Sequence, residues 1–378
     1  MSGILLTPIT VILSAYLALT NSMADGLTTL LDLPTTETVS HIEQTVEDID
    51  EDVEQSEEKL SKLPSRYEYG GTIPDILIQN AAYQKAAVIE SSLEVIEEMA
   101  TSSPEEALVN VYCTYTSDDT VRTTTGSGFF VNENGVLLTN AHVAQLILLN
   151  DVENMGKTEC IIRTGAIATP SYKVDLLYIS PAWIQDNASV ISQAEPKGTG
   201  ERDYALLYVT EGLDNSPIPV HLPYLPAHTE LLPSSVTGAT VSLGGYPANH
   251  FFTEGPEAIL NRRLATTTVA DLFTFGSNYA DIFYLHGSSV GEQGVSGGPI
   301  INEAGQAIGM ISTRSNDTEL GVGSLNAITL SYIHRTMLEE TGFGFADSTT
   351  GNLAYRSEIF KSTLVPFLSA MLVNELGR

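Results

Sequence analysis

A glycine-rich stretch around one serine constrains the fold more than any other part of this chain. Residues 291–300 read GEQGVSGGPI, so Ser296 lies between Gly294 on one side and Gly297 and Gly298 on the other. Glycine weakens a strand and costs backbone entropy, but it allows tight turns and close approach of another backbone or a ligand. The serine is therefore either an ordinary turn residue or a side chain presented for chemistry.

Two other segments carry the partners that a reactive serine needs. A serine hydroxyl becomes a good nucleophile only beside a general base that a third group orients. His142 follows the apolar run in LTNAHVA, and Asp203 begins the apolar run DYALLYV, where we expect it to be half-buried and in need of a partner. Because the chain order His, Asp, Ser is one in which catalytic triads occur, we predict that His142 is the base, Asp203 its orienting acid and Ser296 the nucleophile.

The serine motif has a second interpretation. Its letters also satisfy G-x-S-x-G, the nucleophile elbow of α/β-hydrolases, which places the acid and the histidine after the serine. Only His334 follows Ser296, in a segment that we expect to be helical, and strands do not alternate with helices. The sequence therefore disfavours the α/β-hydrolase fold.

Short β-rich runs broken by Gly, Asn and Asp fill the chain from about residue 107 to 331. Many short strands with regular turn signals are typical of antiparallel barrels, and these runs fall into two groups of about six strands. The first group is ALVNVYCTY, GSGFFVN, GVLLTN, TECIIRT, YKVDLLYIS and DYALLYV, and the second is ATVSLGGYP, LATTTVADLFTF, DIFYLHG, GPIINEAGQAIGMIST and NAITLS. We predict a mostly β protein with two six-stranded antiparallel β-barrels.

The segments GSGFFVNENGVLLTNAHV, DYALLYV, GGYPA and GVSGGPIINEAGQAIGMIS resemble the trypsin-like serine proteases. Within that superfamily they are most similar to the Deg/HtrA type and the bacterial glutamyl endopeptidases, over about residues 107–332. The resemblance implies two barrels with an active site in the cleft between them, and a protein or peptide substrate. It also implies that the backbone N–H groups of Gly294 and Ser296 form the oxyanion hole.

The same resemblance suggests where the primary specificity pocket lies. Val290, six residues before Ser296, would lie near its base, and Gln293 would also contact the substrate. An uncharged base disfavours Lys or Arg at the cleavage position and favours small aliphatic residues. Ser312, Thr313 and Arg314 would form another wall, where Arg314 could instead attract an acidic residue.

Two features depart from familiar members of the superfamily. Digestive trypsin-like enzymes carry an acid before the serine, which pairs with a new N-terminus after zymogen cleavage, whereas this chain has Val295. Deg/HtrA proteins usually carry a PDZ domain after the protease, but fewer than fifty residues follow Tyr332. We therefore expect neither activation by that ion pair nor regulation by a PDZ domain, and the N-terminal region becomes the candidate regulator.

The first residues contain an uncharged apolar segment, Ile4 to Thr20, followed by small residues at Ser22–Ala24. This length suits a signal-peptide core better than a membrane span, although the usual basic start is missing. A cleaved signal peptide, a retained anchor and a buried helix all remain open. With the first two, the protein is extracytoplasmic: secreted, periplasmic or membrane-anchored.

An acidic helical region follows. From Ile42 to Leu63 apolar residues recur at spacings of three, four and seven, and a second helix is expected from Pro74 to Met99. The first helix either docks on its own protein or joins copies through residues 41–99.

We assign residues 1–24 to the signal peptide or anchor, 25–103 to the helical region, 104–232 and 233–345 to the two barrels, and 346–378 to a helical tail. The tail is expected as one helix from Ser357 to Leu376, kinked at Pro366.

Charge and cysteine content limit the partners. The chain carries 47 acidic and 17 basic residues, a net charge of −30, which argues against nucleic acids and anionic membranes. No cofactor motif, CxxC, HExxH or Cys/His cluster is present, so we expect neither a metal nor a cofactor.

In the barrel that the chain resembles, the first strand pairs with the fourth. Cys113 and Cys160 lie on these strands, so a disulfide is expected if the register and an oxidising compartment allow it; otherwise both are buried thiols.

Two classes of function remain open. The first is an exported serine endopeptidase that works through a His-Asp-Ser triad and an acyl-enzyme. The second is a catalytically idle protease-fold scaffold that binds peptides or partners through its N-terminal helices. An intact set of triad residues with its oxyanion glycines favours the enzyme.

Overall fold

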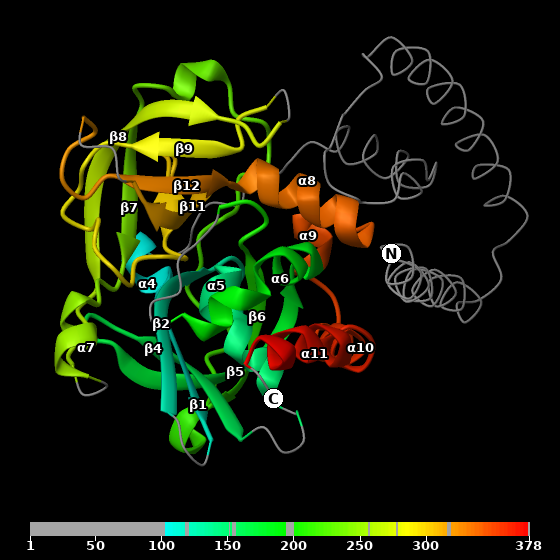
Figure 1. Cartoon of the computed structure of the whole chain (residues 1–378). Coiled ribbons are helices and arrows are strands. Elements are labelled where there is room, and N and C mark those ends of the chain that lie inside the picture. Colours follow the sequence, from blue (N-terminus) through cyan, green and yellow to red (C-terminus); the bar gives the residue numbers. More distant parts are fainter. Residues whose placement is uncertain are drawn as a thin grey trace, which may run out of the picture. The chain divides into compact units, whose positions relative to one another are not determined.

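Two closed β-barrels form the part of the chain that the computed structural model describes. This part is residues 103–376, except for 118–120, 151, 153–155, 194–199, 256–257, 277–278 and 316–318. Each barrel has six antiparallel strands, which confirms the predicted fold and excludes the alternating βα pattern of an α/β-hydrolase (Figure 1). The predicted signal or anchor segment and the helices predicted between residues 42 and 99 lie outside the described residues.

The first barrel closes in the strand order β1-β2-β3-β6-β5-β4. Alternate residues of β1, such as Val109, Val111 and Cys113, are fully buried, as expected for a strand with one face toward a barrel interior. The strands are β1 (Leu108–Thr116), β2 (Val121–Phe130), β3 (Val136–Thr139), β4 (Lys157–Thr164), β5 (Thr169–Ile179) and β6 (Ala205–Gly212).

The second barrel closes in the order β10-β11-β12-β9-β8-β7. Its interior is filled by aliphatic residues and one phenylalanine, Phe283, which are contributed by the strands and by the serine loop. The strands are β7 (Thr240–Gly245), β8 (Arg263–Phe273), β9 (Ile282–Leu285), β10 (Pro299–Ile301), β11 (Ala307–Arg314) and β12 (Leu325–Thr329).

Short helices connect many of these strands. They are α4 (Pro104–Ala107), α5 (Ala141–Ala144), α6 (Pro181–Asn187) and α7 (Asn249–Glu254), with the 3₁₀ turns η2 (Gln145–Leu149), η3 (Ala188–Ser192), η4 (Leu213–Asn215) and η5 (Ser234–Val236). Among the described residues, no helix is long and apolar enough to cross a membrane.

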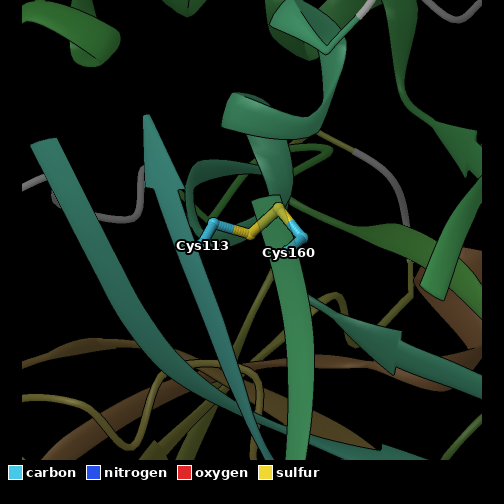
Figure 2. The surroundings of a disulfide bond; sticks show 2 residues. All are labelled: Cys113 and Cys160. Atoms are coloured by element: carbon cyan, nitrogen blue, oxygen red, sulfur yellow. A yellow bond between two sulfur atoms is a disulfide. The ribbon is translucent and has the colours of Figure 1, made fainter. Parts of the chain in front are cut away.

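A disulfide joins neighbouring strands of the first barrel, as predicted. Strand β1 pairs with both β2 and β4, and the register places Cys113 directly opposite Cys160. The two sulfur atoms are bonded (Figure 2). Because side chains at facing positions of an antiparallel pair lie on the same face, this register is the one that permits the bond.

The chain after the second barrel returns to the first. Helix α8 (Leu330–Thr341) follows β12, and α9 (Phe345–Ser348), α10 (Leu353–Thr363) and α11 (Val365–Glu375) come next. The last two helices lie against the first barrel (Figure 1), where Ser357 Oγ donates to the Leu176 carbonyl at 2.8 Å. The prediction of a single helix from Ser357 is wrong. The observed helical segment begins earlier, at Leu353, and is interrupted at Leu364. Pro366 lies in the first turn of α11, where its missing N–H costs little.

Candidate active site

His142 and Asp203 form a buried pair at the base of this site. His142 lies in α5, directly after strand β3, and Asp203 lies two residues before β6. His142 Nδ1 lies 2.8 Å from Asp203 Oδ2, and the His142 backbone N–H donates to Asp203 Oδ1 at 3.0 Å. Both carboxylate oxygens thus hold the same residue, which fixes the plane of the imidazole and leaves Nε2 as the ring atom available to take a proton.

The Asp203 carboxylate is more deeply enclosed than the sequence suggests. We expected it to be half-buried, but it is fully buried. Ser312 Oγ donates to Asp203 Oδ2 at 3.2 Å, and Asn140 Nδ2 donates to the Asp203 backbone carbonyl at 2.8 Å. A carboxylate out of water needs such donors, because an unpaired buried charge costs several kcal/mol.

Ser296 lies in the loop before β10 and is half-buried. Its hydroxyl donates to the backbone carbonyl of Ser312 at 3.2 Å. Ser312 thus contacts two of the three predicted triad members, through its side chain to Asp203 and through its carbonyl to Ser296. A single residue of β11 therefore links Ser296 to Asp203, which in turn contacts His142.

The glycines around Ser296 are required by backbone conformation and by space. Gly294 and Gly297 both have φ of +89°, a region that residues with a side chain rarely adopt. A Cβ at Gly294 would lie 2.4 Å from the Ala248 Cβ, and one at Gly297 would lie 2.0 Å from the Ser127 carbonyl oxygen. The glycine-rich stretch around Ser296 is thus a tight loop that packs against the first barrel on one side and against the β7–α7 connection on the other.

The peptide groups of this loop have a defined orientation. The Gln293 carbonyl accepts from the Ala248 N–H at 2.7 Å, and the Val295 carbonyl accepts from the Gly298 N–H at 2.9 Å. In a trans peptide the N–H points opposite to the carbonyl, so the N–H groups of Gly294 and Ser296 point away from these partners. Within the described part of the chain, neither N–H donates to a protein acceptor.

Ser127, in strand β2 of the first barrel, holds this loop at two points. Its hydroxyl donates to the Gly294 carbonyl at 2.8 Å, and its backbone N–H donates to the Ser296 carbonyl at 2.7 Å. The hydroxyl also accepts from the Tyr246 N–H at 2.8 Å. One residue of the first barrel thus fixes the Gly294–Val295 and Ser296–Gly297 peptides, which lie on either side of the Val295–Ser296 peptide.

The predicted pocket residues lie in different environments. Val290 is fully buried in the core of the second barrel, whereas Gln293 is half-buried and its N–H donates to Asn249 Oδ1 at 3.1 Å. Ser312 is buried against Asp203, Thr313 is half-buried, and Arg314 at the end of β11 is exposed. Arg314 is the one charged member of the set, two residues along the strand from the residue that contacts Ser296.

Three positioning residues were missed by sequence reasoning. Asn140 and Gln145 are buried on either side of His142, and Gln145 Nε2 donates to the His142 carbonyl at 3.1 Å. Asn140 lies within the LTNAHVA motif and could have been noticed there as a buried amide beside a charge. Ser127 and Gln145 carry no local signal, because their role depends on contacts with distant segments.

Tyr246 contributes a neutral polar group beside the serine loop. Burial raises the pKa of Tyr246 to about 12, so its hydroxyl remains protonated and donates to the Gly165 carbonyl at 2.8 Å. Among the residues described, no three His, Cys, Asp or Glu side chains gather as metal ligands would.

Residues 126–310 match the family model of the trypsin-like peptidase domain, a span that includes His142, Asp203 and Ser296. With its two six-stranded barrels, this part of the chain is a trypsin-like serine protease domain. Within this part the chain matches the peptidases, a class of hydrolases.

Similar solved structures were also found. The Rv3671c protease from M. tuberculosis in its active form is 20% identical, with 64% of this chain and 82% of that chain covered and a TM-score of 0.39. Its inactive form is also 20% identical, covers 63% and 90%, and has a TM-score of 0.37. The serine endoprotease from Yersinia pestis is 20% identical, covers 63% and 64%, and has a TM-score of 0.38. No curated protein matches the chain.

Proposed function

We propose that this protein is a serine endopeptidase in which Ser296, His142 and Asp203 act as a catalytic triad. The observation that carries the proposal is the double contact of Asp203 with His142, together with a serine loop in which the Gly294 and Ser296 N–H groups donate to no acceptor among the described residues. Asp203 holds a proton on His142 Nδ1, which makes Nε2 the basic atom of the ring.

The reaction begins with a rotation of the Ser296 hydroxyl from the Ser312 carbonyl toward His142 Nε2. Ser296 Oγ then attacks the scissile carbonyl carbon while its proton passes to Nε2. The carbonyl oxygen becomes an oxyanion, for which the N–H groups of Gly294 and Ser296 are the donors. The C–N bond then breaks, His142 gives its proton to the leaving amine, and an acyl-enzyme on Ser296 remains until water hydrolyses it by the same steps in reverse.

Hydrogen bonds to an oxyanion are strong only if the donors are in place before the charge develops. Removing a single donor of this kind typically costs about 10²- to 10³-fold in kcat. The two carbonyl contacts that orient the Gly294 and Ser296 N–H groups, together with the Ser127 contacts, supply such preorganisation. This arrangement is the second argument for an active enzyme over an idle scaffold.

Labelling with a fluorophosphonate separates the two alternatives. We expect the wild-type protein to be modified at Ser296 and Ser296→Ala to remain unmodified. Ser362→Ala, which removes an exposed serine of α10, should label like the wild type. A wild-type protein that is folded but not labelled would support the scaffold alternative.

Cleavage preference is proposed from the residues around β11. Val290, which the resemblance places near the pocket base, would favour small aliphatic residues, whereas exposed Arg314 would favour an acidic residue. A peptide library cleaved by the wild type and by Arg314→Gln distinguishes the two: an acidic preference that disappears in the variant assigns it to Arg314. An unchanged aliphatic preference in both assigns it to the pocket base.

Export and an N-terminal accessory region complete the proposal. The Cys113–Cys160 bond is typical of an oxidising compartment, which agrees with a signal peptide or anchor within residues 1–24. We propose that residues 41–99 dock on the protease or join copies of the chain. Deleting these residues should change the molecular mass in solution or the cleavage of large substrates, while cleavage of small substrates persists. If neither the mass nor the cleavage of large substrates changes, the region is a spacer.

A further inference from the structure

A buried carboxylate on helix α8 contacts the first barrel through three donors. The Glu340 side chain is 9% exposed. Its Oε1 accepts from Arg202 Nη1 at 2.6 Å and from Ser180 Oγ at 2.9 Å, and its Oε2 accepts from the Tyr178 hydroxyl. Helix α8 follows the last strand of the second barrel, so Glu340 connects the segment after one barrel with the segments around β5 and β6 of the other.

Both sequence neighbours of Asp203 are bound by the same helix. The Arg202 N–H donates to the Tyr332 hydroxyl at 3.2 Å, and its guanidinium contacts Glu340 and, at 3.3 Å, Glu339. On the other side, the Tyr204 hydroxyl lies 3.0 Å from Thr336 Oγ1. Asp203 thus lies between two residues that each make side-chain or backbone hydrogen bonds with α8.

Arg202 is held in a conformation that it would not adopt alone. Its φ is +54°, in the left-handed region, which costs a residue with a side chain roughly 1–3 kcal/mol unless its surroundings enforce it. Its side chain is 7% exposed, and a buried guanidinium needs a carboxylate partner. Burial by itself lowers the pKa of Arg202, but the charge of Glu340 offsets this and raises it above the ordinary value. The Glu340 carboxylate therefore holds the charge of Arg202, while the Tyr332 hydroxyl of the same helix accepts from its backbone N–H.

We propose that Glu340 is a positioning residue that, through Arg202, sets the place of Asp203 and so the orientation of His142. This proposal rests on the proposed triad. Without the Glu340 charge, Arg202 would turn toward water, its backbone would relax from φ +54°, and the Asp203 carboxylate would move. A displacement of about 1 Å in such a site can cost about 100-fold in rate.

The test compares Glu340→Gln with Asp281→Asn in the full-length protein. Asp281 is fully buried and pairs with Arg335, which lies on the same helix α8 but faces the β8–β9 connection of the second barrel. Asp281→Asn therefore removes a comparable ion pair without touching Asp203. We expect Glu340→Gln to lower kcat about 10- to 100-fold with KM nearly unchanged, and Asp281→Asn to leave kcat at the wild-type value for the folded fraction.

Two further measurements separate positioning from stability. In Glu340→Gln the far-downfield proton resonance of the His142 Nδ1–H should shift or broaden, and in Asp281→Asn it should not. The double variant Arg202→Met/Glu340→Met removes the unpaired charge, so thermal stability should recover; because the connection to α8 is still missing, kcat should stay low. If Glu340→Gln does not fold, Thr336→Val takes its place in the test. This variant removes only the hydroxyl next to Tyr204, and we expect it to lower kcat more mildly.

Outcomes for the positioning role and for the triad are distinguishable. A wild-type protein that neither cleaves peptides nor reacts with a fluorophosphonate overturns the triad itself. A wild-type protein that does both, with kcat unchanged in Glu340→Gln and Thr336→Val, overturns the role of α8. An equal fall of kcat in Glu340→Gln and Asp281→Asn would also overturn the role of α8. So would a full recovery of kcat in Arg202→Met/Glu340→Met.

Discussion

Asp203 binds His142 with both of its carboxylate oxygens, one at the ring Nδ1 and one at the backbone N–H, at 2.8 and 3.0 Å. A single hydrogen bond would leave the imidazole free to swing about it. Two bonds, one to the ring and one to the main chain of the same residue, restrict both the ring and the short helix that carries it.

The three triad residues should behave as one unit. We expect Ser296→Ala and His142→Ala each to abolish measurable proteolysis, and Asp203→Asn to lower kcat about 10⁴-fold, because the amide would favour the wrong tautomer of His142. The double variant Ser296→Ala/His142→Ala should lose little more than either single one. The assay is steady-state peptide cleavage, with circular dichroism as the control for folding; wild-type rates in Ser296→Ala would refute the assignment.

Ser127 should affect the rate more than substrate binding. Its hydroxyl holds the Gly294 carbonyl, so Ser127→Ala frees the peptide plane next to an oxyanion donor. We expect kcat to fall by roughly 10-fold or more with KM nearly unchanged, since the lost contact matters mainly when the oxyanion forms. Ser362→Ala is the matched control on an exposed serine. A rise in KM alone would place Ser127 in substrate binding instead.

Activity should not depend on one particular N-terminus. The residue before the nucleophile, Val295, is 1% exposed and packs in the core of the second barrel, where it cannot bind an ammonium group. Proteins that begin at several points between Asp25 and Ser103 should therefore all cleave a small substrate if they fold. Mass spectrometry identifies each N-terminus, and activity at only one of them would contradict the prediction.

The disulfide should stabilise the fold without taking part in catalysis. It closes a segment of 47 residues that contains His142, and chain entropy predicts about 4 kcal/mol of stabilisation for a loop of this length. We expect Cys113→Ser/Cys160→Ser to lower the free energy of unfolding by up to this amount while kcat of the folded protein persists. Alkylation of the unreduced wild type, read by mass spectrometry, should leave both cysteines unmodified; modification of both would disprove the bond.

Stability should decline in alkaline solution. Burial raises the pKa of Tyr246 from 10 to about 12, and it also raises the pKa of Tyr178, Tyr204 and Tyr332. Because the folded state holds these protons more tightly than the unfolded state, the free energy of unfolding is at its full value below pH 10 and falls as the pH rises toward 12. Denaturant titrations should show a shallower decline in Tyr246→Phe and no change in Tyr355→Phe, which alters an exposed tyrosine. Equal slopes in all three proteins would contradict the assignment to Tyr246.

The sequence by itself determined the class of fold and the chemistry-bearing residues. Period-two apolar runs separated by turn residues predicted the two groups of strands, because each barrel strand buries one face. The glycines around Ser296 were informative because only glycine tolerates φ of +89° in so tight a loop. The pairing of the strands that carry Cys113 and Cys160 followed from the family resemblance, but the register that makes the two cysteines face each other did not.

Only the tertiary structure decided how these residues are held. Ser127 contacts the Gly294 carbonyl across 167 positions of the sequence, and Arg202 contacts Glu340 across 138. Such contacts depend on how one barrel and the helix after the other close together, and neither residue type nor spacing encodes that distance. The packing of α10 and α11 against the first barrel is likewise a contact between distant segments, although the break at Leu364 lies only two residues before Pro366. The sequence thus specifies which groups can react, and long-range packing specifies their geometry.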